Sequence, residues 1–358
     1  MKRRSFLKNT VIATGMGVMG YIPNTQAYTK NSVSLVNNNK DQKPLFRFLQ
    51  VNDLHVQSYT VRAFTAYNGG LVGENWYGDT NGRTLWLSEA LKNGFFPELD
   101  FLLIAGDMVV GIGNGLEGIR SDMEYFNEHF IKQLPIPFYP VIGNHENLQD
   151  EGVEASEIYY RQTFGNDKSD YGFVHKGIHF IIFNNSGSGE YVSGKRAKIR
   201  AELLEQMLER HPSLPKVLCC HIPVIPVRHK ETLSKSFRFP NWITMEPEIL
   251  QLTEKHRNKI LAILSGHIHL SGVACHQSVY QIVSSGLASF PHDMTLYSVF
   301  NDRMDVEFIQ IPSDLWEPKS NLYGCRRLRR DITDEQHIDH LSYIMGNPSE
   351  RIFSIPMK

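Results

Sequence analysis

The sequence predicts an α/β protein, because short apolar runs of strand length alternate with helical patterns along the chain. The apolar runs occupy residues 45–51, 101–105, 138–142, 178–183, 217–220 and 260–264. Near-continuous apolar runs of this length are typical of strands that are covered on both faces. No break in composition divides residues 44–320, so we expect this region to form one domain.

Helical patterns lie between several of these strands. Apolar residues recur at helical spacing in three segments: Leu87, Ala90 and Leu91; Ile119, Met123, Phe126 and Phe130; Ile199, Leu203 and Met207. This spacing predicts three amphipathic helices that each turn one apolar face inward. Residues 171–175 and 178–183 flank Lys176-Gly177, which predicts a hairpin.

The C-terminal part of the chain is predicted to be mostly strand, followed by one helix. Strand-like runs occupy residues 273–275, 279–284, 296–300 and 304–311. Residues 333–345 predict a helix, with Gln336 at the capping-box position and Gly346 beyond its end. We therefore expect residues 321–358 to form a C-terminal extension with one helix.

The N-terminus has the order of features that defines an export signal. Lys2, Arg3, Arg4 and Lys8 precede an uncharged stretch at residues 11–22, and Thr25-Gln26-Ala27 offers a cleavage site. Residues 1–27 are therefore predicted to be a signal peptide, and the polar residues 28–43 a flexible linker. Residues 3–8 resemble the twin-arginine signal, which implies a bacterial protein exported to the periplasm or beyond. An ordinary secretory signal and an uncleaved anchor are the alternatives.

Composition excludes several classes of protein. The chain is 41% hydrophobic and 21% charged, which argues against a disordered, collagen-like or polytopic membrane protein. Lys and Arg number 37 against 38 Asp and Glu, so bulk attraction to nucleic acid is not expected. Cys219 and Cys220 lie in an apolar run and are expected to be buried thiols. Pairing of Cys275 with Cys325 stays open, because spacing alone does not establish the geometry.

Polar side chains follow five of the predicted strands at the point where each strand ends. They are Asp53 and His55, Asp107, Asn144 with His145 and Glu146, His221, and His267 with His269. Ligand sites of open α/β sheets form at the carboxyl ends of strands. We therefore expect these side chains to meet in one small volume. Gly106, Gly143 and Gly266 precede three of these groups and would allow tight turns.

This collection of carboxylates and imidazoles indicates a metal site. Such nitrogen and oxygen ligands suit Zn, Mn, Fe, Co or Ni and are poor for Ca or Mg. There are too many ligands for one tetrahedral ion, whereas two ions that share one carboxylate would use them all. The pairs Asp53/His55 and His267/His269 would point the same way on an extended backbone, or clamp opposite sides of a metal pair if the backbone turns.

The five motifs together resemble those of the calcineurin-like metallophosphoesterases. They are D-x-H at Asp53 and His55, G-D at Asp107, G-N-H-E at residues 143–146, the lone His221, and G-H-x-H at His267 and His269. The resemblance spans about residues 45–311, and each motif alone is weak. It implies a four-layer αββα sandwich of two mixed sheets, with a dinuclear metal site on one edge.

The resemblance also implies a role for each residue. Asp53, His55 and His269 would hold one divalent ion (Mn, Fe, Zn or similar), Asn144, His221 and His267 would hold the other, and Asp107 would bridge both. His145 would stabilise the transition state or protonate the leaving oxygen without binding metal. Glu146 is expected to orient its neighbours.

The implied reaction is hydrolysis of a phosphate ester, by in-line attack of a hydroxide that bridges the two metal ions. Phosphatase and phosphodiesterase activities both stay open. We expect a small phosphorylated substrate, no nucleic acid, and membrane contact only through the export signal; the sequence gives no indication of oligomeric state. A catalytically silent binding module on the same fold is the alternative.

Two further expectations concern residues around the motifs. Purple acid phosphatases carry a tyrosine three residues after the bridging aspartate, where this chain has Val110, so a ferric tyrosinate site is not expected. Substrate selection is expected in the long loops at residues 57–83, 111–118 and 225–242. Six of the histidines outside the motifs are expected at the surface; they are His129, His211, His229, His256, His337 and His340.

Overall fold

The computed structural model describes residues 42–58, 78–111, 115–147, 153–165, 167–186, 195–237, 244, 247–316 and 333–358. The predicted signal peptide, Cys325 and much of the expected substrate loops lie outside these residues. Within the described ranges, no helix combines the length and apolar character needed to cross a bilayer.

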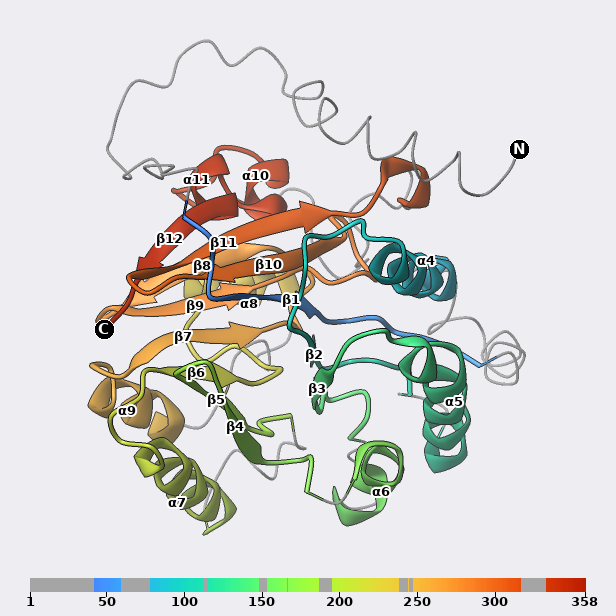
Figure 1. Cartoon of the computed structure of the whole chain (residues 1–358), viewed down its shortest axis with the longest axis horizontal. Helices are drawn as coiled ribbons and strands as arrows, with labels where there is room; N and C mark the ends of the chain where they lie inside the picture. Colours follow the sequence, from blue (N-terminus) through green and yellow to red (C-terminus); the bar gives the residue numbers. More distant parts are fainter. Residues whose placement is uncertain are drawn as a thin grey trace.

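The described strands form two mixed six-stranded sheets (Figure 1). The first has the spatial order β12-β11-β10-β1-β2-β3, from β1 (Phe46–Val51), β2 (Phe101–Ala105), β3 (Phe138–Val141), β10 (Asp293–Val299), β11 (Arg303–Gln310) and β12 (Ile352–Pro356). The second has the order β4-β5-β6-β7-β9-β8, from β4 (Tyr171–His175), β5 (Ile178–Ile182), β6 (Lys216–Cys219), β7 (Ile260–Ser265), β8 (Gly272–His276) and β9 (Val279–Val283). Strands β1, β2 and β3 are parallel to one another, as are β5, β6, β7 and β9.

Helices cover the outer face of each sheet. The first sheet packs against α4 (Thr80–Lys92), α5 (Gly115–His129) and α6 (Val153–Phe164), and the second against α7 (Lys195–Glu209) and α9 (Pro247–Lys255). The remaining helical segments are η1 (Ile131–Gln133), α8 (Lys230–Phe237), η3 (Ser313–Leu315), α10 (His340–Met345) and α11 (Pro348–Arg351). This arrangement confirms the predicted four-layer αββα sandwich.

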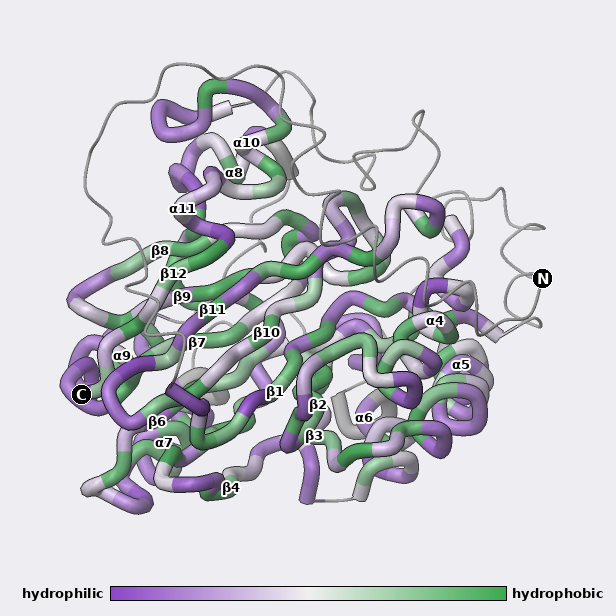
Figure 2. The backbone as a smooth tube through the Cα atoms, turned by 45° about the horizontal axis from the view of Figure 1, so that its top comes forward, coloured by the Kyte–Doolittle hydropathy of each residue, from purple (hydrophilic) through white to green (hydrophobic). Residues whose placement is uncertain are grey.

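The two sheets pack face to face over an aromatic and aliphatic core. Phe48 on β1 stacks on Phe101 and Tyr297 at 4.9 and 4.4 Å between ring centroids, and meets Phe180 of the other sheet edge-on at 5.4 Å. Hydrophobic segments accordingly run along the central strands (Figure 2). Gln50 adds a polar link between the sheets, because its Nε2 donates to the Ser265 carbonyl oxygen at 2.9 Å. This link fixes β1 against β7 beside the ends that carry Asp53 and His267.

Most predicted elements match the structure, but some differ, and helices α6, α8, α9 and α11 were not predicted. The predicted face of α7 is shifted, because Ile199 is exposed while Leu204 and Leu208 are buried. The helix predicted over residues 333–345 is wrong in its first half: only His340–Met345 is α-helical, and Asp339 rather than an earlier residue caps it. Residues 352–356 form strand β12, which pairs with β11 and which the sequence analysis did not anticipate.

Partly buried ionic contacts hold the C-terminal segment against the sandwich. Arg228 Nη1 donates to Glu350 Oε1 at 2.8 Å, and His337 Nε2 donates to Glu350 Oε2 at 2.9 Å. Arg351 binds both carboxylate oxygens of Asp293 at 2.8 and 2.9 Å. His337 is 1% exposed, so its predicted surface position is wrong. Its two ring nitrogens face Asp334 and Glu350, and it can donate to both only as the imidazolium.

Glu350→Gln is expected to weaken folding in a pH-dependent way. Burial alone would raise the pKa of Glu350, but the hydrogen bond from His337 and the charge of Arg228 outweigh it and lower the pKa to about 2. A lowered carboxyl pKa stabilises the folded state above the unfolded value of about 4.5, and this stabilisation disappears as the pH falls towards 2. We expect the free energy of unfolding in urea to fall by about 3 kcal/mol at pH 7. The loss should shrink steadily below pH 4.5.

Glu335→Gln is the matched control, because Glu335 is an exposed residue of the same segment. It should change the free energy of unfolding by less than about 0.5 kcal/mol at any pH. A loss in Glu350→Gln that stayed constant from pH 7 to pH 2.5 would show that its charge contributes nothing to stability.

Candidate metal centre

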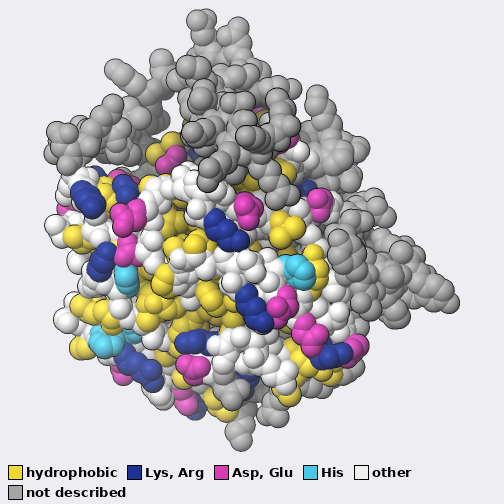
Figure 3. All heavy atoms as spheres, turned by 45° about the vertical axis from the view of Figure 1, so that its right-hand side comes forward, with side chains coloured by type: hydrophobic (Ala, Val, Ile, Leu, Met, Phe, Trp, Pro, Cys, Tyr) yellow, Lys and Arg dark blue, Asp and Glu magenta, His cyan; other side chains and the backbone are white. Residues whose placement is uncertain are grey.

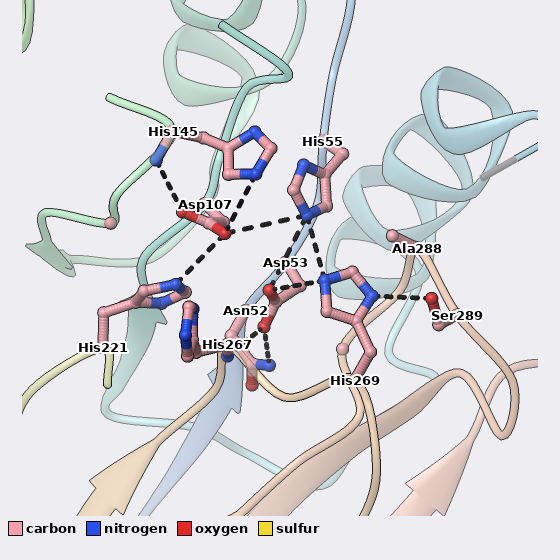
Figure 4. A network of polar contacts seen from close by, with 12 residues as sticks. Asn52, Asp53, His55, Asp107, His145, His221, His267, His269, Ala288 and Ser289 are labelled. Carbon is pink, nitrogen blue, oxygen red and sulfur yellow. Dashed lines mark hydrogen bonds and ion pairs between the residues drawn. The ribbon is translucent and has the colours of Figure 1, made fainter. Parts of the chain in front are cut away.

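Both sheets deliver side chains to one site at the carboxyl ends of their strands (Figure 4). From the first sheet, Asp53 and His55 follow β1, Asp107 follows β2, and Asn144 and His145 follow β3. From the second sheet, His221 follows β6, and His267 and His269 follow β7. Side chains up to 216 positions apart in the sequence thus meet in one pocket, as the position of the motifs at strand ends predicts.

Two groups of potential metal ligands form there, and they share one residue. Asp53, His55, Asp107 and His269 each offer an atom within 4.8 Å of the others, and so do Asp107, His221 and His267. Asp107 belongs to both groups. The family resemblance implies the same division of ligands between two metal ions. The individual ligand roles stay predictions.

The distances show nitrogen and oxygen atoms crowded around common points. His55 Nε2 and His269 Nε2 lie 3.3 Å apart, and His269 Nε2 lies 3.1 Å from Asp53 Oδ1. In the second group, His221 Nε2 lies 3.1 Å from Asp107 Oδ2. His55 Nε2, from the first group, lies 3.8 Å from the same oxygen. A cation at such points would turn crowded donor atoms into ligands.

Three buried atoms of the site support this fit. Asn144 Oδ1 accepts no hydrogen bond from any residue that the structure describes, and Asp53 Oδ1 and His221 Nε2 lie 3.1 Å from His269 Nε2 and Asp107 Oδ2 without the geometry of a hydrogen bond. A buried polar atom without a hydrogen bond costs about 1–3 kcal/mol. Metal ions would supply the missing partners, so the residues present suit two divalent cations. The buried amide oxygen of Asn144 would extend the Asp107, His221 and His267 group to the predicted set.

Neighbouring groups fix the histidine rings so that Nε2 faces the site. His221 Nδ1 lies 2.8 Å from the Ala105 carbonyl oxygen, which can only accept, so Nδ1 carries the hydrogen. His269 Nδ1 lies 2.6 Å from Ser289 Oγ. Such partners set the tautomer and orientation of metal-binding imidazoles. Ser289 lies outside every motif, and no sequence signal pointed to it.

The backbone turns at the ligand residues instead of staying extended. Asp53, His55 and Asp107 have φ of 48°, 44° and 50°, and His267 and His269 have φ of 72° and 50°. Non-glycine residues rarely adopt this left-handed region, and such strain concentrates at functional sites. The turn leaves Asp53 and His55 in one ligand group but sends His267 and His269 to different groups.

Two of the predicted glycines are required for different reasons. Gly106 has φ of 88°, and a Cβ there would lie 2.4 Å from His221 Nδ1. Position 143 has no room for a side chain, because a Cβ on Gly143 would lie 2.1 Å from the Asp107 backbone nitrogen. Gly106 therefore allows His221 to approach the chain closely, and Gly143 does the same for Asp107.

The charges of the buried side chains at the site suit the binding of cations. Burial alone would raise the pKa of Asp107, but the imidazoles of His221 and His145 hold it well below its usual range. Burial would lower the pKa of His221, but the charge of Asp107 outweighs it and raises the pKa to about 9. A metal ion requires the neutral imidazole, so metal binding at His221 would release a proton.

Glu146 lies behind Asp107 and organises the backbone around it. Its carboxylate accepts from the backbone N–H groups of Gly143, Asp107 and Val109 at 2.7, 3.1 and 3.0 Å. Burial raises the pKa of Glu146 to about 8, and the charge of Asp107 adds to the rise. These contacts support the orienting role expected from its sequence position.

His145 stands at the open side of the site and belongs to neither ligand group. Its side chain is 12% exposed, and its Nε2 lies 3.8 Å from Asp107 Oδ2. Its Nδ1 lies 2.5 Å from the Val110 carbonyl oxygen, so Nδ1 carries the hydrogen and Nε2 faces the site. Burial lowers the pKa of His145 to about 3, against the opposing effect of Asp107.

Comparison with known proteins identifies relatives at the level of family and fold. The family described as calcineurin-like phosphoesterase matches residues 46–271. A dimetal phosphatase from Danio rerio is similar in structure, with a TM-score of 0.54 and 16% identity, over 75% of this chain and 97% of that one. The purple acid phosphatase PPD1 from yellow lupin (Lupinus luteus) is also similar, with a TM-score of 0.54 and 13% identity, over 75% of this chain and 52% of that one. No curated protein matches the chain by sequence.

Proposed function

Because the chain belongs to the calcineurin-like phosphoesterase family, we propose that it is a metal-dependent hydrolase of phosphate esters. The observation that carries this proposal is the pair of ligand groups that share Asp107. Two divalent ions held this way would lower the pKa of water and neutralise the charge of a phosphoryl group. The names of both similar structures include a phosphatase, which agrees with the proposal.

The protein's own residues would orient the substrate and move a proton. His145 can face a substrate oxygen only through Nε2, because Nδ1 is held by the Val110 carbonyl. A phosphate anion beside Nε2 favours the imidazolium, since an opposite charge raises a pKa. His145 would then stabilise the charge that develops on the phosphoryl group or protonate the leaving oxygen. Glu146 would keep the backbone of Asp107 in place.

We favour a small phosphorylated substrate. On the face in Figure 3, Lys and Arg side chains are interspersed with Asp and Glu instead of gathering in one basic track. A protein that tracks nucleic acid backbones needs such a track. After removal of residues 1–27 the chain would have 33 basic residues against 38 acidic ones. We expect the substrate loops to determine whether the protein hydrolyses a monoester or a diester.

Hydrolysis should depend on added metal. The protein stripped with a chelator is expected to be inactive on 4-nitrophenyl phosphate and its diester, and Mn or Zn should restore turnover of at least one of them. The Asp107→Ala variant, treated identically, controls for hydrolysis by free metal. Release of 4-nitrophenolate and metal content by mass spectrometry are the measurements. Protein that holds two metals per chain and turns over neither ester would favour the silent binding module.

A further inference from the structure

A buried carboxylate lies behind His145, outside the metal centre. Asp122 is on α5, is 0% exposed, and belongs to neither ligand group. One carboxylate oxygen, Oδ1, accepts from the Ser58 backbone N–H at 2.7 Å. The other, Oδ2, accepts from the Gly111 backbone N–H at 3.4 Å. A buried carboxylate is costly unless it is hydrogen-bonded, and these two backbone N–H groups supply the hydrogen bonds.

The Gly111 N–H belongs to the same peptide group as the Val110 carbonyl that binds His145. Asp122, one peptide group and the His145 ring therefore form a single chain of hydrogen bonds, from Oδ2 through the peptide to Nδ1. Hydrogen bonds in series polarise one another. A negative charge on Asp122 would attract the Gly111 N–H group and polarise the peptide, which would make the Val110 oxygen a stronger acceptor.

We propose that Asp122 is a positioning residue for His145 and acts through the Val110–Gly111 peptide group. The inference rests on the proposed hydrolysis. Asp122 holds the hydrogen of His145 on Nδ1 and keeps Nε2 directed at the reacting phosphoryl group. In many enzymes a carboxylate binds the imidazole directly to fix its tautomer; here a backbone peptide lies between them.

The other carboxylate oxygen of Asp122, Oδ1, holds this chain of hydrogen bonds in place through Ser58. The segment after β1 runs beside the segment after β2, since Val56 N–H donates to the Met108 carbonyl at 2.9 Å and Val110 N–H donates to the Val56 carbonyl at 3.1 Å. Asp122 binds the end of each segment, at Ser58 and at Gly111. A Cβ on Gly111 would lie 2.2 Å from the His145 carbonyl oxygen, so this peptide is packed directly against the histidine.

The charge state of Asp122 sets the conditions of the test. Burial raises the pKa of Asp122 to about 7, while the N–H donors of Ser58 and Gly111 act in the opposite direction. Kinetics are therefore measured at pH 8.5, where the carboxylate predominates. The Asp122→Asn variant removes the charge and turns an amide N–H group towards one of the two backbone donors.

A double-mutant cycle with His145 tests the proposal. Asp122→Asn is expected to lower kcat roughly tenfold when His145 is present, with KM and metal content unchanged, and to have no effect in the His145→Ala background. An equal loss in both backgrounds would assign Asp122 a purely structural role and overturn the proposal. Glu124→Gln, an exposed position two residues along α5, should leave kcat unchanged. If Asp122→Asn does not fold, Asp122→Ser takes its place in the same cycle.

Nitrogen NMR of the ring tests the same inference without turnover. In protein labelled with 15N-histidine, the resonance missing from His145→Ala identifies His145. Its shifts should report hydrogen on Nδ1 in the wild type and a mixture of tautomers in Asp122→Asn. Identical His145 shifts in the two proteins would overturn the proposal. An inactive wild type with the expected shifts would instead contradict the proposed hydrolysis and leave this chain of hydrogen bonds intact.

Discussion

Replacing Asp107 with alanine is expected to abolish both metal pairing and hydrolysis. Asp107 is the one residue common to the two ligand groups, so its loss removes a ligand from each ion. Two ions held by these groups would repel each other, and a shared carboxylate would offset that repulsion. We expect the metal content to fall to one ion per chain or fewer, and turnover to fall by at least ~10³-fold, since metal ions supply several kcal/mol of transition-state stabilisation.

Mass spectrometry of the purified variant and the aryl phosphate assay measure the two effects separately. Asp167→Ala is the control, because Asp167 is a largely exposed carboxylate far along the chain from the motifs. It should keep both the metals and the activity. If Asp107→Ala retained two ions per chain, Asp107 would not bridge them, and the proposed arrangement of ligands would have to be abandoned.

Replacing His145 with alanine is expected to lower turnover while metal binding stays intact. His145 belongs to neither ligand group, and its Nδ1 is bound to the Val110 carbonyl. The variant should therefore hold as much metal as the wild type. Turnover should fall by about 10²–10⁴-fold, the usual contribution of a group that transfers a proton in the transition state. Substrate binding should change little.

His129→Ala provides the matched histidine control, because His129 is exposed at the end of α5. Metal analysis decides the interpretation of the His145 variant. Loss of metal in His145→Ala would mean that the imidazole is a ligand, and its role as a separate catalytic group would be wrong.

The strand ends made the site predictable from sequence. Five of the six apolar runs stop where a polar motif begins, and parallel strands bring their carboxyl ends to one edge. The same runs predicted strands that are covered on both faces, whereas the division into two sheets was implied by the family resemblance. The order of the strands within each sheet could not be predicted, because apolar runs such as Phe101–Ala105 carry no information about which strand lies beside them.

Residues that act through another residue were harder to predict from the sequence. Asp122 lies between Ile119 and Phe126 on the apolar stripe of α5, and an acidic residue on a buried helix face was a usable signal. Ser289 gave none, because it reaches His269 only through the folding of a loop. His337 appeared to be a surface residue because its partner Glu350 lies 13 positions away and is brought close by α11.

The first sheet also has a consequence for how the chain reaches its final structure. β1 lies between β2 and β10, and the hydrogen-bonded pair Arg47 and Ser298 on β1 and β10 is separated by 251 positions. At about 5–20 residues per second of synthesis, roughly 10–50 s would pass before the ribosome produces this partner. Until then one edge of β1 offers unpaired amides to other chains, and such edges promote aggregation. A newly made chain with this topology would therefore benefit from a chaperone that shields β1 until β10 has been made.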